Sequence, residues 1–208
     1  MSPLCRCVAQ SDGGHRARGA LVARPKARWY SPDHELMLPT TPCPFPPEFL
    51  DDLPYDPEVL FFDELTEVDP ERSLVRCRMP THGALPFTTS QRAHPLRHPS
   101  HVAGAVMVHA SGMLGFVHAY YLLGLRHHEG WVGYGTHIHR VVFRKLVPPG
   151  SPIDATCIAT KIRRGSTRYL VRYSFAFRHE GDLCYEGDQT AVWMDVNRDK
   201  AAAEVSAD

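Results

Sequence analysis

The sequence predicts an α+β fold in which an antiparallel sheet wraps around one long, buried helix. Within residues 93–123, a loop rich in His and Pro is followed by a long, mostly apolar run, which is typical of a buried helix. Two short apolar segments precede this stretch, and several segments with alternating apolar and polar residues follow it. A hairpin, a helix and a run of antiparallel strands together predict one sheet packed on one helix.

The central helix is expected to begin at Ser100, whose hydroxyl can accept a hydrogen bond from a backbone N–H of the first turn. Gly104, Gly112 and Gly115 lie within it, and each would weaken an isolated helix by roughly 1 kcal/mol relative to alanine. A helix that keeps these glycines is expected to have a neighbour that approaches its backbone closely, such as a curved sheet.

The strands are predicted from short apolar-rich segments that are separated by turn signals. A hairpin is predicted from residues 59–66 and 74–79, with its turn at 68–71. Further strands are predicted at 136–147, 153–163, 167–178 and 183–195. Alternation is clearest in 167–178, where one face carries Tyr169, Val171, Tyr173, Phe175 and Phe177. This apolar face is expected to pack on the helix.

The chain is expected to hold one domain between two less regular ends. Residues 1–57 are interpreted as a leader and a Pro-rich arm that is partly disordered, because prolines between 39 and 57 prevent regular structure throughout. The predicted domain covers residues 58–196, and residues 197–208 are expected to form a flexible tail.

Composition argues against several classes of partner. The formal net charge is zero, which gives no reason to expect nucleic acid as a ligand. His109 and His118 interrupt the most apolar run, so no membrane span is expected. The six Cys are scattered without a disulfide framework, which favours a reducing, cytoplasmic compartment. His137 and His139 share a predicted strand, but two ligands do not make a metal site, and no metal is expected.

The order of elements resembles the hotdog fold, and local stretches sharpen the resemblance. Residues 62–72 (FDELTEVDPER) resemble the first hairpin of the β-hydroxyacyl-ACP dehydratases, and residues 144–150 (RKLVPPG) resemble the end of a later strand. The stretch from His94 to Ala110 resembles their loop and central helix, which read H-F-P-G and then P-G-V-L-M-I-E-A. The resemblance implies a hotdog domain that acts on acyl thioesters.

One position departs from the dehydratase pattern in a way that bears on chemistry. The helix carboxylate of those enzymes falls on His109 here, and no Asp or Glu occurs between Glu71 and Glu129. Eight of the thirteen His lie in that interval, namely His82, His94, His98, His101, His109, His118, His127 and His128. Any acid–base chemistry near the helix start is therefore expected to use histidine, which can take and return a proton near neutral pH.

A second resemblance, to the hotdog acyl thioesterases, aligns without an inserted residue. Residues 100–104 (SHVAG) are similar to the segment that opens the same helix in hotdog acyl thioesterases, including the FcoT-like branch, although the Asn of that motif is Ala103 here. Some FcoT-like relatives add an amine to an enoyl thioester on an acyl carrier protein before releasing the acid. This resemblance implies thioesterase-like hydrolysis, alone or coupled to such an addition, in a fatty-acid or polyketide-type pathway.

Two alternatives stay open. The first is a dehydratase or isomerase that uses His94 with a displaced acid such as Asp188 or Glu186. The second is a hotdog module that binds acyl groups without catalysis. The acyl group is expected on the phosphopantetheine of an acyl carrier protein or on CoA, with no other cofactor. The resemblance also predicts a homodimer joined edge to edge, since an exposed sheet edge invites pairing.

The predicted site gathers around the start of the helix. The candidate catalytic groups are His94, His101, His109 and the backbone of Gly104, because free N–H groups at a helix start can stabilise charge on a carbonyl oxygen. The predicted substrate-binding residues are Ala103, Val106, Met113 and Phe116, with Trp131 near the helix exit, and Arg164 and Arg168 as contacts for phosphates or an acidic carrier protein.

Overall fold

The computed structural model describes residues 38–198, so residues 1–37 of the predicted leader and arm (1–57) and residues 199–208 of the predicted tail (197–208) lie outside the described residues. The strands are β1 (Glu64–Asp69), β2 (Leu74–Met79), β3 (Trp131–Phe143), β4 (Ile153–Arg164), β5 (Arg168–His179) and β6 (Asp182–Asp195). The helical segments are α1 (Pro47–Asp51), the 3₁₀ turn η1 (Pro57–Val59), α2 (Gly104–His118) and its π-helical continuation η2 (Ala119–Leu123).

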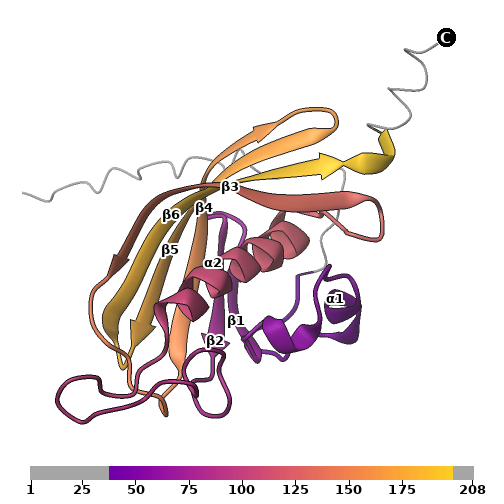
Figure 1. Cartoon of the computed structure of the whole chain (residues 1–208). Coiled ribbons are helices and arrows are strands. Elements are labelled where there is room, and N and C mark those ends of the chain that lie inside the picture. The colour runs from indigo at the N-terminus through magenta and orange to yellow at the C-terminus, as the bar shows by residue number, and fades with distance from the viewer. Residues whose placement is uncertain (1–37, 199–208) are drawn as a thin grey trace, which may run out of the picture.

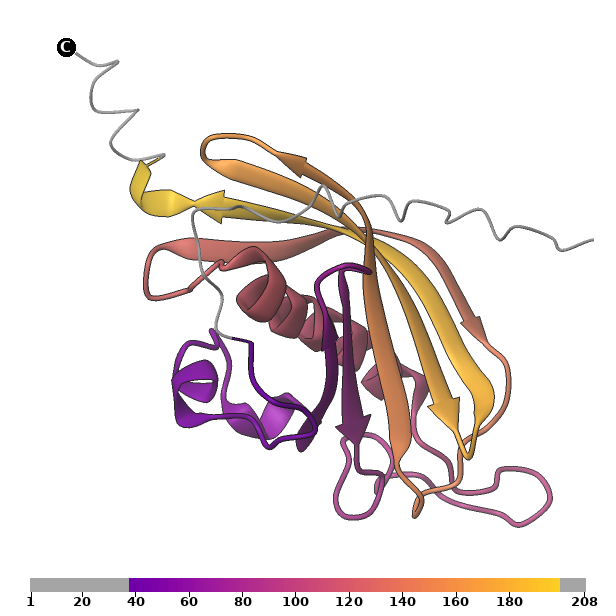
Figure 2. The ribbon, with the colours of Figure 1, turned by 180° about the vertical axis from the view of Figure 1, so that it is seen from behind.

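The strands form one six-stranded antiparallel sheet in the order β1-β2-β4-β5-β6-β3. The sheet curves around α2, which lies in its concave face (Figures 1 and 2). A single long helix wrapped by an antiparallel sheet is the hotdog arrangement, so the predicted fold class is confirmed. The alternation predicted in β5 is also confirmed, because Val171, Tyr173, Phe175 and Phe177 are buried.

The central helix begins later than predicted. Ala103 rather than Ser100 occupies the N-cap position, and no side chain of the cap itself bonds to the first turn. Instead, the hydroxyl oxygen of Thr88 accepts the N–H of Ala103 at 3.1 Å. At the other end, Gly124 terminates the helix with a φ of 68°, a left-handed conformation that glycine adopts without steric cost.

The glycines of α2 meet different surroundings. A Cβ at Gly104 would lie 2.8 Å from Cζ of Phe143 on β3, and one at Gly115 would lie 3.8 Å from the Tyr173 ring on β5. Gly104 therefore shows the expected close approach of the sheet, whereas the distance at Gly115 is an ordinary van der Waals contact. A Cβ at Gly112 would meet no atom within 4 Å. Gly112 therefore faces open space.

The first hairpin differs from its prediction on one side. β2 spans the predicted residues, but β1 begins only at Glu64, so the prediction of a strand from residue 59 is wrong. Residues 57–59 form the turn η1, and Phe61 has a φ of 63°. Pro57 can begin a helical turn because it needs no N–H partner there. The chain is thereby bent before it enters the sheet.

The segment before β1 packs on the domain. Phe49 of α1 is fully buried, and its ring stacks on Phe45 and Tyr121 with centroid distances of 5.0 and 5.5 Å. The carboxylate of Asp52 accepts the backbone N–H groups of His127 and His128, each at 2.9 Å. Residues 38–63, called the arm below, therefore contribute to the hydrophobic core and are tied to the turn after α2.

By length and composition alone, Gly104–Leu123 is apolar enough to cross a membrane, although its histidines had been expected to prevent this. However, 67% of its most apolar window is buried inside the structure, which is the packing of a core helix.

Candidate active site

A cavity of about 260 Å³ lies between α2 and the sheet. One wall comes from α2, the opposite wall from β3, β5 and β6, and the arm contributes Tyr55. The wall from α2 contains Val108, His109, Ser111, Gly112, Met113, Gly115 and Phe116, and the wall from the sheet contains Gly133, Tyr134, Gly135, Tyr173, Phe175, Gln189, Ala191 and Trp193. Apolar walls with a few polar groups are typical of a site for a small organic ligand.

Glycines on both walls keep this cavity open. A Cβ at Gly112 on α2, or at Gly135 on β3, would meet no atom within 4 Å. At Gly133 a Cβ would lie 2.4 Å from the ring of Trp193, so this glycine lets the indole pack against the strand. The space between helix and sheet therefore depends on residues without side chains.

His109 is the titratable group of the cavity that is best placed for proton transfer. Its Nε2 lies 2.8 Å from the carbonyl oxygen of Val59, which belongs to the arm. A carbonyl oxygen only accepts, so Nε2 must carry the proton and the neutral ring keeps its lone pair on Nδ1. The Phe61 ring packs edge-on against the imidazole at 5.2 Å. His109 is thus held in one tautomer, with Nδ1 as the proton acceptor.

Two further polar side chains of the cavity were missed by the sequence analysis. The Ser111 hydroxyl lies 2.9 Å from both the Met107 carbonyl oxygen and the Tyr185 hydroxyl. The amide nitrogen Nε2 of Gln189 is buried, and although the Tyr185 hydroxyl lies beside it, no hydrogen bond of normal geometry joins them. Nε2 of Gln189 is therefore a donor that a ligand can use.

No Asp or Glu lies among the residues that line this cavity. The two acids considered as displaced partners of His94 are on β6, whose inner face carries Tyr185, Gln189 and Trp193 toward α2. Alternation along the strand puts Glu186 and Asp188 on the outer face. The carboxylate of Glu186 accepts hydrogen bonds from Arg144 and Arg140, which lower its pKa below the ordinary value. The geometry does not support a dehydratase that pairs either acid with His94.

The structure does not bring the three candidate histidines together. His94 lies in the loop before α2, where its Nδ1 accepts the N–H groups of Leu96 and Arg97 at 3.2 and 3.1 Å. His101 pairs with Gln91 through its backbone, and its Nδ1 lies 2.8 Å from the carbonyl oxygen of Pro99. Both rings therefore brace the loop, and neither lines the cavity that contains His109.

The remaining predicted residues are also divided. Met113 and Phe116 line the cavity with His109, whereas Val106 is buried in the core and the face of Gly104 is covered by Phe143. Ala103 lies at the helix start, next to Gly104 and outside the cavity lining. Trp131 lines two separate hollows further along the helix.

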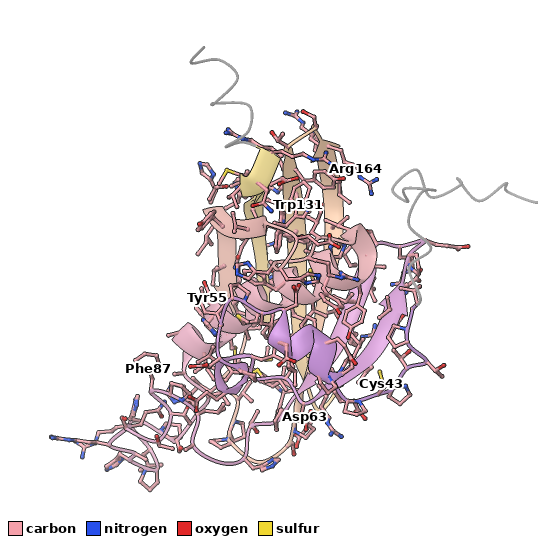
Figure 3. The ribbon with its side chains drawn as sticks, turned by 90° about the vertical axis from the view of Figure 1, so that its right-hand side faces the viewer. Cys43, Tyr55, Asp63, Phe87, Trp131 and Arg164 are labelled. Carbon is pink, nitrogen blue, oxygen red and sulfur yellow. The ribbon has the colours of Figure 1, made fainter. Side chains whose placement is uncertain are left out.

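The predicted phosphate contacts lie at the β4–β5 hairpin, outside the residues that line the cavity. Arg164 ends β4 and Arg168 begins β5, and both side chains are exposed. The Arg164 guanidinium lies 5.5 Å from the centre of the Tyr169 ring. Figure 3 shows Arg164 near the tip of this hairpin, well separated from Tyr55 at the cavity. The two arginines are therefore not part of the site around His109.

Filling the cavity should change which ligands fit. Gly112→Leu places a side chain in open space, so we expect a folded protein whose preferred acyl chain is shorter. Gly115→Leu crowds the Tyr173 ring instead, and overpacking of this kind commonly costs about 1–3 kcal/mol. Thermal unfolding and the activity profile over a series of acyl chain lengths would separate the two effects, with Gly112→Ala as the matched control. An unchanged profile in folded Gly112→Leu would place the acyl site elsewhere.

A scan against protein-family models gives no match, and a search of curated proteins gives none either. Among solved structures, the chain is similar to a thioesterase from Haemophilus influenzae, with a TM-score of 0.45 and 17% identity over 64% of this chain and 78% of that one. It is also similar to a mutant thioesterase from Pseudomonas aeruginosa, with a TM-score of 0.46 and 13% identity over 67% and 85% of the two chains. It is similar as well to a mutant thioesterase from Staphylococcus aureus, with a TM-score of 0.43 and 12% identity over 62% of this chain and 91% of that one. The strand order and the central helix described above identify the fold.

Proposed function

We propose that the protein hydrolyses an acyl thioester in the cavity beside His109. The observation that carries this proposal is the fixed tautomer of His109, a residue that lines the mostly apolar cavity. Its Nε2 donates to the Val59 carbonyl oxygen, so Nδ1 keeps the lone pair that can accept a proton. A general base within an apolar, partly water-excluded site is what attack of water on a thioester requires. The absence of a carboxylate from the lining residues leaves the imidazole as the group for this role.

In the proposed reaction, Nδ1 of His109 takes a proton from a water molecule as its oxygen attacks the thioester carbon. The carbonyl oxygen gains negative charge, which the N–H of the buried Gln189 amide can stabilise by donating a hydrogen bond. The C–S bond then breaks, the free acid forms, and the sulfur leaves with the proton that His109 held. Water and thioester are thereby converted to a carboxylic acid and a thiol.

The proposed substrate is an acyl group on an acyl carrier protein or on CoA, within a fatty-acid or polyketide-type pathway. The apolar walls around Met113 and Phe116 support an acyl chain as the ligand. The exposed Arg164 and Arg168 are proposed to meet phosphates or the carrier protein outside the cavity, and no other cofactor is proposed. We also propose a cytoplasmic location, which the free thiols of Cys43, Cys77, Cys157 and Cys184 support.

The same base could serve a coupled reaction, in which an amine adds to the β-carbon of a 2-enoyl thioester before hydrolysis. Incubation of the full-length protein with saturated, 3-hydroxy and 2-enoyl thioesters, with and without an amine, distinguishes the possibilities by intact-mass spectrometry. Free acid from the saturated thioester supports hydrolysis, and an amine adduct supports the coupled reaction. An enoyl thioester formed from the 3-hydroxy substrate indicates a dehydratase instead. Binding without turnover of any of them indicates an acyl-binding module.

The protein is expected to form a homodimer through the edge of β3. At the opposite edge, Leu65 of β1 exchanges backbone hydrogen bonds of 2.9 and 3.0 Å with Cys43 of the arm. Within residues 38–198, the outer edge of β3 pairs with no strand, and Tyr134, Ile138 and Phe143 are 56%, 57% and 52% exposed. Such an edge favours strand pairing between copies. Light scattering at micromolar concentration should give a dimer, and Ile138→Lys should weaken it; a monomeric native protein contradicts this prediction.

A further inference from the structure

The arm passes beside the cavity between two fixed points and contributes Tyr55 to its lining. On one side, Asp52 is held by the N–H groups of His127 and His128 and by the Nδ1 atom of His128 at 2.6 Å. On the other side, the Val59 carbonyl oxygen accepts the bond from His109, and Leu60 is 1% exposed. Residues 54–58 between these points are exposed. Residues 52–60 of the arm, called the strap below, are therefore fixed at both ends and exposed in the middle.

Tyr55 is the residue of this strap that faces the cavity. It lines the cavity of about 260 Å³ that contains His109, and also a neighbouring hollow of about 170 Å³ that contains His127. The two spaces share Tyr55, Phe116, Gly133 and Tyr134, so they meet at these residues. The Tyr55 ring stands edge-on to Phe116 at 5.7 Å and remains 49% exposed.

The two aromatic rings at this junction are held differently. The Phe116 ring also packs edge-on against Trp193 at 5.1 Å, and Trp193 is buried in the sheet. Tyr55 belongs to the arm and contacts the Phe116 ring, and about half of the Tyr55 surface is exposed to solvent. Removal of the Tyr55 ring would join the two hollows, whereas removal of the Phe116 ring would also disturb the core.

We propose that Tyr55 sets the longest straight acyl chain that the cavity accepts. The inference rests on the proposed function for the identity of the ligand. A chain whose carbonyl lies near His109 extends along α2 past Met113, and its end meets the Tyr55–Phe116 pair. Shorter chains stop before this pair, while longer chains require the hollow beyond it. The arm, which precedes the hotdog sheet, therefore supplies both the group that orients the base and the group that limits the substrate.

The test is equilibrium binding of a series of saturated straight-chain carboxylates to the full-length protein, measured by titration calorimetry. Each methylene buried in an apolar wall contributes about 0.8 kcal/mol, so affinity should rise roughly fourfold per added methylene until the chain end reaches Tyr55. In Tyr55→Ala this rise should continue to longer chains, and in Tyr55→Trp it should stop at shorter ones. Tyr55→Phe keeps the ring, and Asp56→Ala changes a neighbouring strap residue outside both hollows; both should match the native protein.

An identical limit in native protein and folded Tyr55→Ala would overturn the proposal, and so would failure of the native protein to bind any carboxylate of the series. The outcome is independent of the proposed reaction, because carboxylates are bound without turnover. If the longest chain bound changes with substitution of Tyr55 but no thioester is hydrolysed, the role of Tyr55 is supported and the proposed hydrolysis is rejected. If thioesters are hydrolysed but the longest chain bound does not change, hydrolysis is supported and the role of Tyr55 is rejected.

Discussion

Replacement of His109 by glutamine should lower kcat/KM for thioester hydrolysis by about 10²–10⁴-fold, which is the usual cost of losing a general base. The amide of glutamine can still donate to the Val59 carbonyl oxygen, as Nε2 of His109 does at 2.8 Å. The contact that holds the arm can therefore survive, while the proton acceptor is lost. We expect the melting temperature of His109→Gln to stay close to that of the native protein.

His109→Ala gives the matched comparison. It removes the base and also leaves the Val59 carbonyl oxygen without its donor, and a lost hydrogen bond of this kind costs about 1 kcal/mol. The two variants should thus share the loss of activity but differ in stability. Activity that falls only in His109→Ala, and recovers in His109→Gln, would mean that His109 positions the arm and is not the base.

His94→Ala and His101→Ala complete the experiment, because both were equally good candidates from the sequence. Their rings accept or donate hydrogen bonds within the loop before α2 and do not line the cavity. Near-native turnover is therefore expected for both, with greater protease sensitivity of the loop. A loss of turnover comparable to that of His109→Gln in either variant would move the active centre to the helix start.

The elements with strong local periodicity could be predicted from the sequence. The alternation of β5 and the long apolar run of α2 depend on residues that are close in the chain, and both appear within a few residues of their predicted limits. β3 begins at Trp131, five residues before its predicted start at Thr136, since Gly133 and Gly135 near its start give the sequence of a loop. These glycines serve the cavity and the Trp193 ring instead.

The features that sequence reasoning missed depend on distant partners. Ser100 has the right chemistry for an N-cap, but Thr88 supplies the bond near the helix start. Val59 looked like part of a strand, yet its carbonyl oxygen is fixed by His109, fifty residues further along the chain. Gln189 carried no motif, although strand alternation from Tyr185 and Trp193 would have put it on the inner face. The local sequence pattern predicts the helix or strand, but it does not predict which distant residue will form a hydrogen bond with it.

The histidines illustrate the same limit for the site. Resemblance to the dehydratase loop made His94 as good a candidate base as His109, but the backbone turn at 94–98 uses its Nδ1 as an acceptor. Only the tertiary structure shows which imidazole nitrogen already has a partner and which ring meets a cavity. His118, in the same helix as His109, meets neither solvent nor cavity, and its effect should be on stability.

The protein should lose stability on mild acidification because of His118. The ring is fully buried, with Nε2 at 2.9 Å from the Ser73 hydroxyl and Nδ1 at 3.5 Å from the Tyr173 hydroxyl. Burial disfavours the charged imidazolium and lowers the pKa of His118 from 6.5 to about 3. The unfolded chain therefore binds a proton at a pH where the folded protein does not.

This difference in proton binding makes the folded protein less stable at lower pH. Well above pH 6.5 His118 is neutral in both the folded and the unfolded state, so it adds no pH dependence. As pH falls below 6.5 toward 3, the unfolded state gains the proton and the folded state does not, so stability declines. The limiting slope is about 1.4 kcal/mol per pH unit, and acidification from about pH 7 to pH 5 should cost roughly 2 kcal/mol. For a domain of ordinary stability this is a large share of the total.

The measurement is urea unfolding of the native protein and of His118→Gln from about pH 7 to pH 5. In this range the contribution of His118 to the free energy of unfolding is separated from those of carboxylates, which titrate at lower pH. His118→Gln should be less stable at neutral pH, because it disturbs the bonds to Ser73 and Tyr173, but its midpoint should depend less on pH by the slope assigned to His118. The carboxyl groups of Glu186 and Asp182 are common to both proteins, and their lowered pKa values make their loss of stability fall below this range. Parallel pH profiles for the two proteins would mean that His118 binds its proton equally well in the folded and unfolded states, and that its burial is relieved on protonation.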